Sequence, residues 1–486
     1  MMSDISSRES DWRRRLRDEI PAKERTAIPR TSMAMLPADY RIHNNEEVNQ
    51  GLNAEQAVME STRCLDCPDP QCVTGCPVNI DIPGFIKNIQ RGDIGAAASV
   101  LRATSALPAV CGRVCPQEKQ CEARCIYNKM KKQPVAIGWL ERYAADTERL
   151  SGNRPVVEQL ASNGIRIAVA GSGPCGLSFA GDMAKMGYEV TVFEALHEIG
   201  GVLKYGIPEF RLPNSVVDAE LDSLRALGVK FVPDTVIGKT ISYDDLLNEG
   251  FAALFVASGA GLPRFMGIPG ENYINILSSN EYLTRINLMH AGTKGWDTPV
   301  PRGKRVAVIG GGNTAMDSVR TALRMGAEKA FLVYRRGEDE MPARREEIEH
   351  AKEEGVEFMT LSNPVEYLAD EAGRVRAMRV QRMELGEPDE SGRRSPVPIE
   401  GAVDEIPVDV VVVSVGVSPN PLIPEAIDGL EVTRRGTIAV NDSMQSSMPL
   451  IFAGGDIVRG GATVILAMGD GRHAAAALDA YLRQTV

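Results

Sequence analysis

Cysteine is the residue type in this chain whose spacing points most directly to chemistry. Eight of the nine cysteines in the 486-residue chain lie between Cys64 and Cys125, and none follows Cys175. Thiolates at such short intervals, some directly followed by proline, are typical of iron–sulfur ligands, whereas structural zinc sites favour paired knuckles. We therefore predict two [4Fe-4S] clusters, with zinc and unliganded thiols as the alternatives. The two runs are Cys64, Cys67, Cys72 and Cys76, and Cys111, Cys115, Cys121 and Cys125.

Two glycine-rich turns predict dinucleotide sites. Gly171, Gly173 and Gly176 follow an apolar run at 165–170 and open a helical pattern, and Glu194 ends the next apolar run. In such a unit the glycines bring the backbone close to a pyrophosphate at a helix N-terminus, and the carboxylate binds ribose hydroxyls. The first turn is thus expected to bind a dinucleotide whose adenosine ribose carries no 2′-phosphate.

The second turn extends from Gly310 through Gly312 to Ala315, and the apolar run after it ends at Arg335 and Arg336 rather than at an acid. A guanidinium can pair with a 2′-phosphate that a carboxylate would repel, so this turn is expected to bind NADP(H). The alternative for the two arginines is a solvated surface pair.

Further residues are expected near these turns. Apolar runs end at Gly416 and Asp456, and a helix expected to begin near Thr463 could stabilise negative charge on a reduced flavin. Arg344 and Arg345 are expected to form i,i+4 ion pairs with glutamates of their own helix. The five histidines are scattered and no nucleophile–base arrangement stands out, so the chemistry is assigned to cofactors and no catalytic side chain is predicted.

The segments that must position these motifs change in kind along the chain. Residues 1–45 are polar and interrupted by prolines, which predicts an extended arm with one short helix near 12–20. Residues 46–150 show helical apolar spacing, and a stretch near 151–164 is expected to be a linker. Beyond it, two strand–turn–helix–strand units predict parallel sheets, so the fold class is α/β behind a helical cysteine domain.

Composition argues against several classes of protein. The formal net charge of −11 disfavours nucleic acid as the main partner. No run of 18 apolar residues is present and the first residues show no apolar signal segment, so no membrane association is expected. The expected location is the cytoplasm, with the thiols reduced.

Several segments from about residue 45 to the C-terminus resemble the family of the small, or beta, subunit of NADPH-dependent glutamate synthase. This family of flavin and iron–sulfur oxidoreductases also includes the N-terminal part of dihydropyrimidine dehydrogenase and the large subunit of NADH-dependent ferredoxin:NADP oxidoreductase, a bifurcating transhydrogenase. The segments are CPVNIDIPGFI, CGRVCP, GGVLKYGIPEFRLP, GGGNTAMDSVRTALRMGA, YRR, GEPDESGRR and FAGGDIVRGGATVILAMGDGR.

The resemblance implies a domain plan and two sets of cofactor contacts. The plan is an arm at 1–45, an iron–sulfur domain at 46–150, an FAD domain at 151–285 and 420–486, and an NADPH domain inserted at 286–419. The implied FAD contacts are Gly171, Gly173, Gly176, Glu194, Gly201, Arg211, Asp456 and Thr463, and the implied NADPH contacts are Gly312, Asn313, Thr314, Arg335, Arg336 and Gly416.

The resemblance also implies how the thiols divide. From the residues alone, each run could hold its own cluster, or the last cysteine of a run could ligate the other cluster, as in two-cluster ferredoxins. The family implies the crossed arrangement, with Glu141 of IGWLERY, where the dehydrogenase relative has glutamine, as an oxygen ligand and Cys111 as a structural thiol. Whether Glu141 or Cys111 completes the second cluster stays open. The implied sets are Cys64, Cys67, Cys72 and Cys125 for the first cluster, and Cys76, Cys115, Cys121 and Glu141 for the second.

The implied function is electron transfer from NADPH through FAD and two [4Fe-4S] clusters to a partner protein. The preferred partner is a large FMN-containing glutamate synthase subunit that makes L-glutamate from 2-oxoglutarate and glutamine, so the chain alone should only oxidise NADPH. One alternative is the large subunit of the ferredoxin:NADP enzyme. It is favoured by the segments YRIHNNEEVNQGL and ATVILAMGDGR, in which the typical beta subunit has a different sequence. Others are an electron-input subunit for a pyrimidine reductase and a non-catalytic cluster scaffold, against which two intact nucleotide motifs argue.

Overall fold

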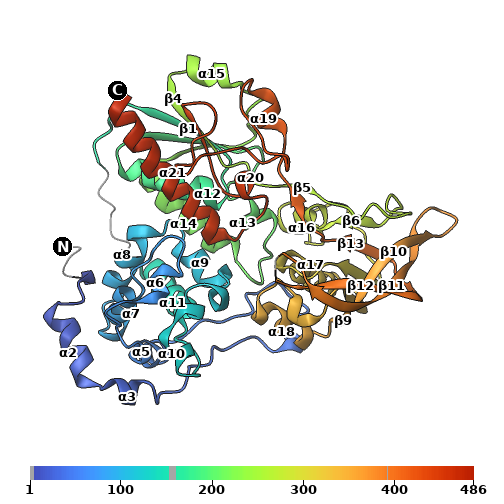
Figure 1. The fold of residues 1–486 in the computed structure, drawn as a ribbon, viewed down its shortest axis with the longest axis horizontal. Coiled ribbons are helices and arrows are strands. Elements are labelled where there is room, and N and C mark those ends of the chain that lie inside the picture. Colours follow the sequence, from blue (N-terminus) through green and yellow to red (C-terminus); the bar gives the residue numbers. More distant parts are fainter. Residues whose placement is uncertain (1–4, 153–159, 391, 486) are drawn as a thin grey trace.

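A helical part that carries the cysteines packs against two α/β parts in the computed structural model (Figure 1). The structure describes residues 5–152, 160–390 and 392–485. The linker predicted near 151–164 therefore lies partly outside the described residues, as does the start of the predicted arm.

The N-terminal arm runs along the helical part and then reaches an α/β part. Its helices are α2 (Asp11–Glu19), α3 (Ala22–Arg25) and α4 (Ala38–Arg41). The short helix predicted near 12–20 is confirmed by α2. Arg41, at the end of α4, donates a hydrogen bond to Glu354 from the second α/β part (2.7 Å), so the arm spans two parts of the molecule.

The helical part confirms the helices predicted from apolar spacing. Asn53, Asp81 and Asp93 cap three of them with side-chain hydrogen bonds, and prolines stand in the first turns of two. The cysteines lie mostly at helix ends and in the connections. The elements are α5 (Ala54–Arg63), α6 (Gln71–Thr74), α7 (Ile82–Gln90), α8 (Ile94–Thr104), α9 (Pro108–Val114), η1 (Gln117–Lys119), η2 (Glu122–Arg124), α10 (Ile126–Lys129) and α11 (Ile137–Ser151).

The first α/β part is built from two separate stretches of sequence. Its parallel strands lie in the order β15-β4-β1-β2-β3, and β15 joins the sheet after the chain has passed through the second α/β part. The predicted insertion of one α/β domain in another is therefore confirmed. The elements are β1 (Arg166–Ala170), α12 (Pro174–Lys185), β2 (Glu189–Phe193), α13 (Val202–Tyr205), α14 (Asn214–Ala226), β3 (Lys230–Val232), α15 (Tyr243–Asn248), β4 (Phe251–Val256), α19 (Leu422–Ala426), β15 (Ile451–Ala453), α20 (Asp456–Arg459) and α21 (Val464–Thr485).

The second α/β part begins earlier than predicted. Its parallel strands lie in the order β6-β13-β7-β8-β9, and β6 pairs with β13 through Ile276, Leu277 and Ser278. The boundary predicted at 286 is thus wrong, because a strand ahead of it belongs to this sheet. The elements are β6 (Ile276–Ser278), α16 (Ser279–Asn287), β7 (Arg305–Ile309), α17 (Asn313–Arg324), β8 (Lys329–Tyr334), η3 (Glu338–Glu340), α18 (Arg345–Glu353), β9 (Glu357–Thr360) and β13 (Val410–Val413).

Two antiparallel sheets complete the described fold. A sheet of β10 (Ser362–Ala369), β11 (Val375–Pro388) and β12 (Arg394–Pro407) projects from the second α/β part at the right of Figure 1 and was not predicted. The short strands β5 (Leu262–Pro263) and β14 (Val417–Ser418) pair where the chain passes between the two α/β parts.

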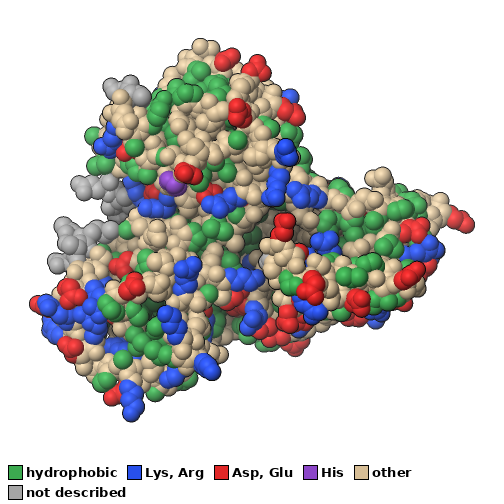
Figure 2. Space-filling view, in the orientation of Figure 1, with side chains coloured by type: hydrophobic (Ala, Val, Ile, Leu, Met, Phe, Trp, Pro, Cys, Tyr) green, Lys and Arg blue, Asp and Glu red, His purple; other side chains and the backbone are tan. Residues whose placement is uncertain are grey.

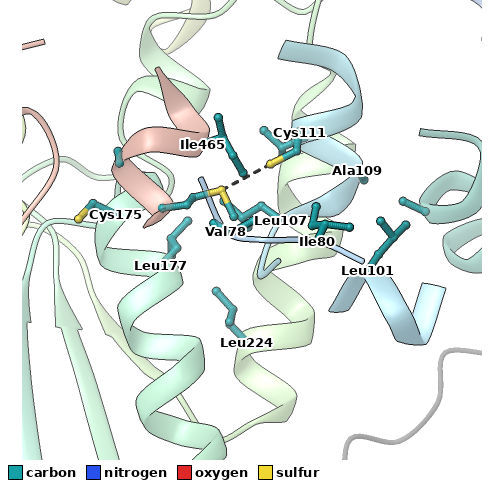
Figure 3. Packing of buried hydrophobic residues seen from close by; sticks show 14 of the residues in the cluster. Val78, Ile80, Leu101, Leu107, Ala109, Cys111, Cys175, Leu177, Leu224 and Ile465 are labelled. Carbon is teal, nitrogen blue, oxygen red and sulfur yellow. Dashed lines mark hydrogen bonds between the residues drawn. The ribbon is translucent and has the colours of Figure 1, made fainter. Parts of the chain in front are cut away.

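The helical part and the first α/β part share one hydrophobic core. Figure 3 shows Ile80 and Leu107 from the helical part beside Leu177 of α12, Leu224 of α14 and Ile465 of α21. Burying these faces against one another fixes the cysteine-bearing loops relative to the first sheet.

A membrane-spanning helix must meet requirements of length and apolar character. Among the described helices, no single one is long and apolar enough to cross a membrane, whereas the bent pair Ile94–Thr104 and Pro108–Val114 meets that requirement by length and composition.

Candidate functional site

A pocket in the helical part collects side chains from both cysteine runs. Cys76 follows α6, Cys115 ends α9, and Cys121 lies between η1 and η2. Across the described residues, no three His, Cys, Asp or Glu side chains are gathered tightly enough to hold one metal ion. The donors are instead distributed around the walls of a pocket. We call it the second cysteine pocket, because it contains the predicted ligands of the second cluster. The donors that line it are Cys76, Cys111, Cys115, Cys121 and Glu141.

Glu141 is a buried carboxylate with one oxygen, Oε1, that has no hydrogen-bond partner among the described residues. The residue is 6% exposed. Burial, with a smaller contribution from the charge of Glu220, raises the pKa of Glu141 to about 8. An unpaired carboxylate is costly in an apolar pocket unless a cation or a metal centre neutralises it, so this side chain fits an iron ligand.

Cys111 differs from the other thiols of the pocket. It is fully buried within α9, and its Sγ lies 3.5 Å from the Met468 sulfur of α21, the contact drawn as a dashed line in Figure 3. A thiol with a partner in a hydrophobic contact fits the predicted structural role. Which of Glu141 and Cys111 completes the second cluster stays a prediction.

The first group of thiols includes Cys125 rather than Cys76. Burial, with smaller contributions from the charges of Cys64 and Cys125, raises the pKa of Cys67 to about 11. The pKa of Cys72 is raised well above its ordinary value by burial and then by Cys64, Cys125 and Cys67. These effects mark the four thiols as neighbours, which is the grouping of the crossed arrangement.

The second group is marked in the same way. The pKa of Cys121 is raised by burial, then by Glu122, Glu141 and Cys76. Cys76 therefore neighbours the second run, although it belongs to the first in sequence. Besides burial, the charges of both Glu141 and Cys111 contribute to the raised pKa of Cys76, so the grouping places Cys76 with the second run but does not choose between these two residues. The predicted ligand sets stay predictions.

Cations surround the first group, a feature that sequence reasoning missed. Buried Asp66, between Cys64 and Cys67, receives hydrogen bonds from Arg13 and Arg17 of α2. The Lys87 ammonium is buried in α7 and donates to the Cys64 carbonyl at 2.5 Å. A positive charge there would stabilise the negative charge of thiolates around a cluster. A lysine within the apolar run IPGFIKNIQ was the available signal.

The first glycine turn presents its backbone to open space. An added Cβ at Gly173 would meet no atom of the described residues within 4 Å, whereas one at Gly176 would lie 2.1 Å from the Gly171 carbonyl oxygen. Gly176 thus keeps α12 close to the turn, and Gly173 leaves room for a ligand. This combination fits a pyrophosphate at the N-terminus of α12.

The predicted acidic residues of this part lie near the turn. Glu194 Oε2 accepts hydrogen bonds from the Ser172 amide (2.9 Å) and hydroxyl (2.5 Å). Asp456 begins α20, beside the turn residue Cys175, and burial raises its pKa to about 6. Thr463 precedes α21, where its hydroxyl oxygen accepts from Gln120 of the helical part at 3.4 Å.

Arg211 lies between the two α/β parts, and its predicted FAD contact stays a prediction. Its buried guanidinium donates to Asp317 (2.7 Å) and lies 3.1 Å from Glu347, both in the second α/β part. Two carboxylates at this distance account for the position of the guanidinium. Arg211 therefore joins the two α/β parts.

The second glycine turn opens α17. An added Cβ at Gly312 would meet no atom of the described residues within 4 Å, so this backbone also borders open space. Asn313 begins the helix, and its Oδ1 accepts from the Arg344 amide at 2.8 Å. Thr314 lies in the same first turn, and Gly416 also borders open space within the described residues.

The two arginines after β8 have different environments. Arg335 is exposed, whereas Arg336 is buried and ion-paired with Asp389 of the projecting hairpin. Buried Arg336 Nε has no hydrogen-bond partner among the described residues. Both side chains follow the strand beside the second turn, where a 2′-phosphate is expected.

The prediction for Arg344 is wrong. Helix α18 begins at Arg345, so Arg344 precedes the helix and donates instead to the Arg113 carbonyl (2.6 Å) and to Gln117 (3.0 Å) of the helical part. Arg344 also forms an ion pair with Glu346, but the two residues are two positions apart in sequence rather than the predicted four. Arg345 is exposed.

Glu354 is the centre of a buried ion network between the parts, and its replacement by glutamine should destabilise the protein. Its carboxylate accepts from Arg41, Arg320 and Arg324. Glu354→Gln would leave buried cations uncompensated, at a cost of about 3–5 kcal/mol. Urea unfolding should show a lower midpoint than Glu353→Gln, whose side chain is 46% exposed and should cost about 0–1 kcal/mol.

The same network predicts acid sensitivity. Burial would raise the pKa of Glu347, but Arg211 and Arg320 lower it from 4.5 to about 2. A carboxyl group with a lowered folded-state pKa contributes stability that is complete above its unfolded value. The free energy of unfolding should therefore fall as pH decreases from 4.5 towards about 2. An unchanged urea midpoint over this window would contradict the ion pairs.

Comparisons with known proteins agree with this arrangement. The family model described as dihydropyrimidine dehydrogenase domain II, 4Fe-4S cluster, matches residues 41–153. The model for pyridine nucleotide-disulphide oxidoreductases matches 229–471, and that for NAD(P)-binding Rossmann-like domains matches 169–219. These matches confirm the predicted fold class.

Three relatives and one solved structure complete the comparison. The glutamate synthase (NADPH) small chain of Halomonas elongata is 36% identical over 92% of this chain and 95% of its own length, and that of Azospirillum brasilense is 37% identical over 92% and 93%. The NADP(+)-dependent formate dehydrogenase subunit beta of Moorella thermoacetica is 39% identical over 85% of this chain but 60% of its own length. FprA from Mycobacterium tuberculosis (His57Gln mutant) shares the fold, with a TM-score of 0.56 and 21% identity over 66% of this chain and 85% of that chain.

Proposed function

The chain belongs to the family of glutamate synthase (NADPH) small chains and is an NADPH-dependent oxidoreductase, and from this premise we propose that it supplies electrons to a large FMN-containing subunit that makes L-glutamate from 2-oxoglutarate and glutamine. The observation that carries the proposal is that two glutamate synthase small chains are 36% and 37% identical over 92% of this chain. Cytoplasmic location belongs to the same proposal.

The residues fit the cofactors that this function needs. Gly173 and Gly312 leave room for FAD and NADPH, and two groups of thiols, one with the unpaired carboxylate of Glu141, suit two [4Fe-4S] clusters. When bound, the flavin accepts a hydride from NADPH and the clusters carry single electrons.

One helix contacts both kinds of site. Ile465 of α21 lines the second cysteine pocket, and an added Cβ at Gly471 of the same helix would lie 2.4 Å from the Cys175 carbonyl oxygen in the first glycine turn. The chain thus holds the flavin turn and the second pocket on a shared rigid element. All four thiols of the first group are part-exposed, whereas Cys76 and Cys115 of the second group are buried and Cys121 is part-exposed. We infer that the first group faces the electron acceptor.

The N-terminal arm places exposed charges of both signs beside the first group. Figure 2 shows Lys and Arg side chains together with acidic ones where α2 lies, and the exposed residues of this helix include Asp11, Arg14, Arg15, Asp18 and Glu19. Arg14 is ion-paired with Asp11 at 2.8 Å. Charges of both signs can fix the register of a partner that carries the complementary pattern. We propose that this surface docks the large subunit.

Reconstitution tests the proposal. The chain alone should oxidise NADPH only with an artificial acceptor, and addition of a large glutamate synthase subunit, glutamine and 2-oxoglutarate should yield glutamate. Ferredoxin-dependent NADH oxidation without glutamate formation would favour the ferredoxin:NADP alternative instead. A second candidate, electron exchange with a formate dehydrogenase, is favoured by the relative from Moorella thermoacetica.

Nucleotide preference gives a sharper prediction. Arg335→Gln should raise the KM for NADPH roughly 10- to 100-fold, because a charged hydrogen bond to the 2′-phosphate would be lost. The KM for NADH should not change, since NADH has no such phosphate. Arg336→Gln should also weaken Asp389 pairing and lower the stability of the hairpin. Equal loss with both nucleotides would contradict the assignment of Arg335.

A further inference from the structure

The loop beside the second cysteine pocket contacts the segment after the second glycine turn. Lys119 Nζ donates to the Pro342 carbonyl at 2.8 Å and the Ala343 carbonyl at 3.2 Å. The Ala343 amide in turn donates to the carbonyl of Gly311, within the turn, at 3.2 Å. Two sites far apart in the sequence are therefore joined by direct hydrogen bonds.

Arg344 lies at the centre of this junction. Its side chain is 6% exposed, and its guanidinium donates to the Arg113 carbonyl and to Gln117 Oε1. Its backbone amide donates to Asn313, the first residue of α17. One residue thus contacts the nucleotide turn with its backbone and the helical part with its side chain.

Gln117 carries the connection to the pocket. It lines the pocket, and its Nε2 contacts the Cys111 carbonyl at 3.4 Å. It is also packed against α11, since an added Cβ at Gly138 would lie 2.2 Å from Gln117 Nε2. Glu141 lies one turn further along α11. A displacement of Gln117 would therefore displace α9, which ends at Cys115 and carries Cys111, and α11, which carries Glu141.

We propose that Arg344 is a positioning residue that couples nucleotide binding at the second glycine turn to the second iron–sulfur site. A nucleotide phosphate bound at the N-terminus of α17 would contact Asn313, whose side-chain Oδ1 accepts the hydrogen bond of the Arg344 backbone amide. A displacement of Asn313 would therefore move Arg344, and the buried guanidinium of Arg344 would in turn move Gln117. The coupling is reciprocal, so the oxidation state of the second site changes the affinity for NADP⁺. The inference rests on the proposed function, because it requires both the nucleotide and the cluster.

EPR-monitored redox titration of the purified protein, with and without NADP⁺, tests the coupling. We expect NADP⁺ to shift the midpoint potential of the second cluster, whose signal is identified by its absence in Glu141→Ala. The shift should be lost in Arg344→Gln and in Gln117→Met, which breaks the same hydrogen bond from the other side. Arg345→Gln, the same change in an exposed neighbour, should keep the shift.

The outcomes separate this inference from the proposed function. A protein that holds both clusters and oxidises NADPH, but whose cluster potentials do not respond to NADP⁺, overturns the coupling alone. A full shift in both Arg344→Gln and Gln117→Met also overturns it. A purified protein without iron overturns the proposed function and the coupling together.

Discussion

Replacement of Glu141 by alanine is expected to remove the second iron–sulfur cluster and about half of the bound iron. The reason is that the carboxylate is buried, accepts no hydrogen bond at Oε1 from the described residues and lines the pocket with Cys76, Cys115 and Cys121. Iron and sulfide content, with EPR of the reduced protein, measures the loss. Glutamate formation with the large subunit should disappear, whereas hydride transfer from NADPH to the flavin should persist.

Two further variants make this test specific. Glu141→Gln keeps an oxygen donor, so it should retain the cluster with an altered EPR signal. Cys111→Ser should retain all of the iron, because the Cys111 thiol contacts Met468 and serves packing. Loss of a cluster in Cys111→Ser together with full iron in Glu141→Ala would reverse the assignment of the fourth ligand.

Two glycine-to-alanine substitutions, one in each glycine turn, should show which turn binds FAD and which binds NADPH. Gly173→Ala adds a methyl that meets no atom of the described residues within 4 Å, so the protein should fold normally but bind FAD at least about tenfold more weakly. Gly312→Ala has the same surroundings at the second turn. It should keep its FAD and raise the KM for NADPH by a similar factor.

The measurements are flavin content after gel filtration and steady-state kinetics with NADPH. Gly95→Ala is the matched control, because it adds the same methyl to α8, where the nearest atom is 3.9 Å away in Asp93. It should change neither quantity. If Gly312→Ala released the flavin while Gly173→Ala retained it, the assignment of the two turns would be exchanged.

Local patterns predicted much of this fold because they are determined by neighbours in sequence. The glycine turns, the strands before them and the helices of the cysteine domain follow from short-range spacing, and the structure confirms them. The position of β6 depends on pairing with β13, far along the chain, and no local signal marks it. The projecting hairpin likewise depends on pairing between exposed strands.

The candidate site was predictable in its residue types and less so in its partners. Sequence spacing alone could not decide whether Cys125 joins the first thiols, because the answer depends on how η2 and α10 return to α5. Arg211 was expected at the FAD site and Arg344 in ion pairs within its own helix, yet both guanidiniums have buried partners in another part of the molecule. An arginine motif does not specify which distant carboxylate or carbonyl will be buried beside it.

The hydrophobic core shared by the helical part and the first sheet has a consequence for folding. Because Leu107, Leu177 and Ile465 lie in one cluster, neither part can be removed without exposing the apolar face of the other. A fragment lacking the first 150 residues would uncover α12 and α21, so it should aggregate rather than persist as a small flavoprotein. The two parts are therefore expected to melt in one cooperative transition, and damage to the cluster loops should lower the temperature at which flavin is released.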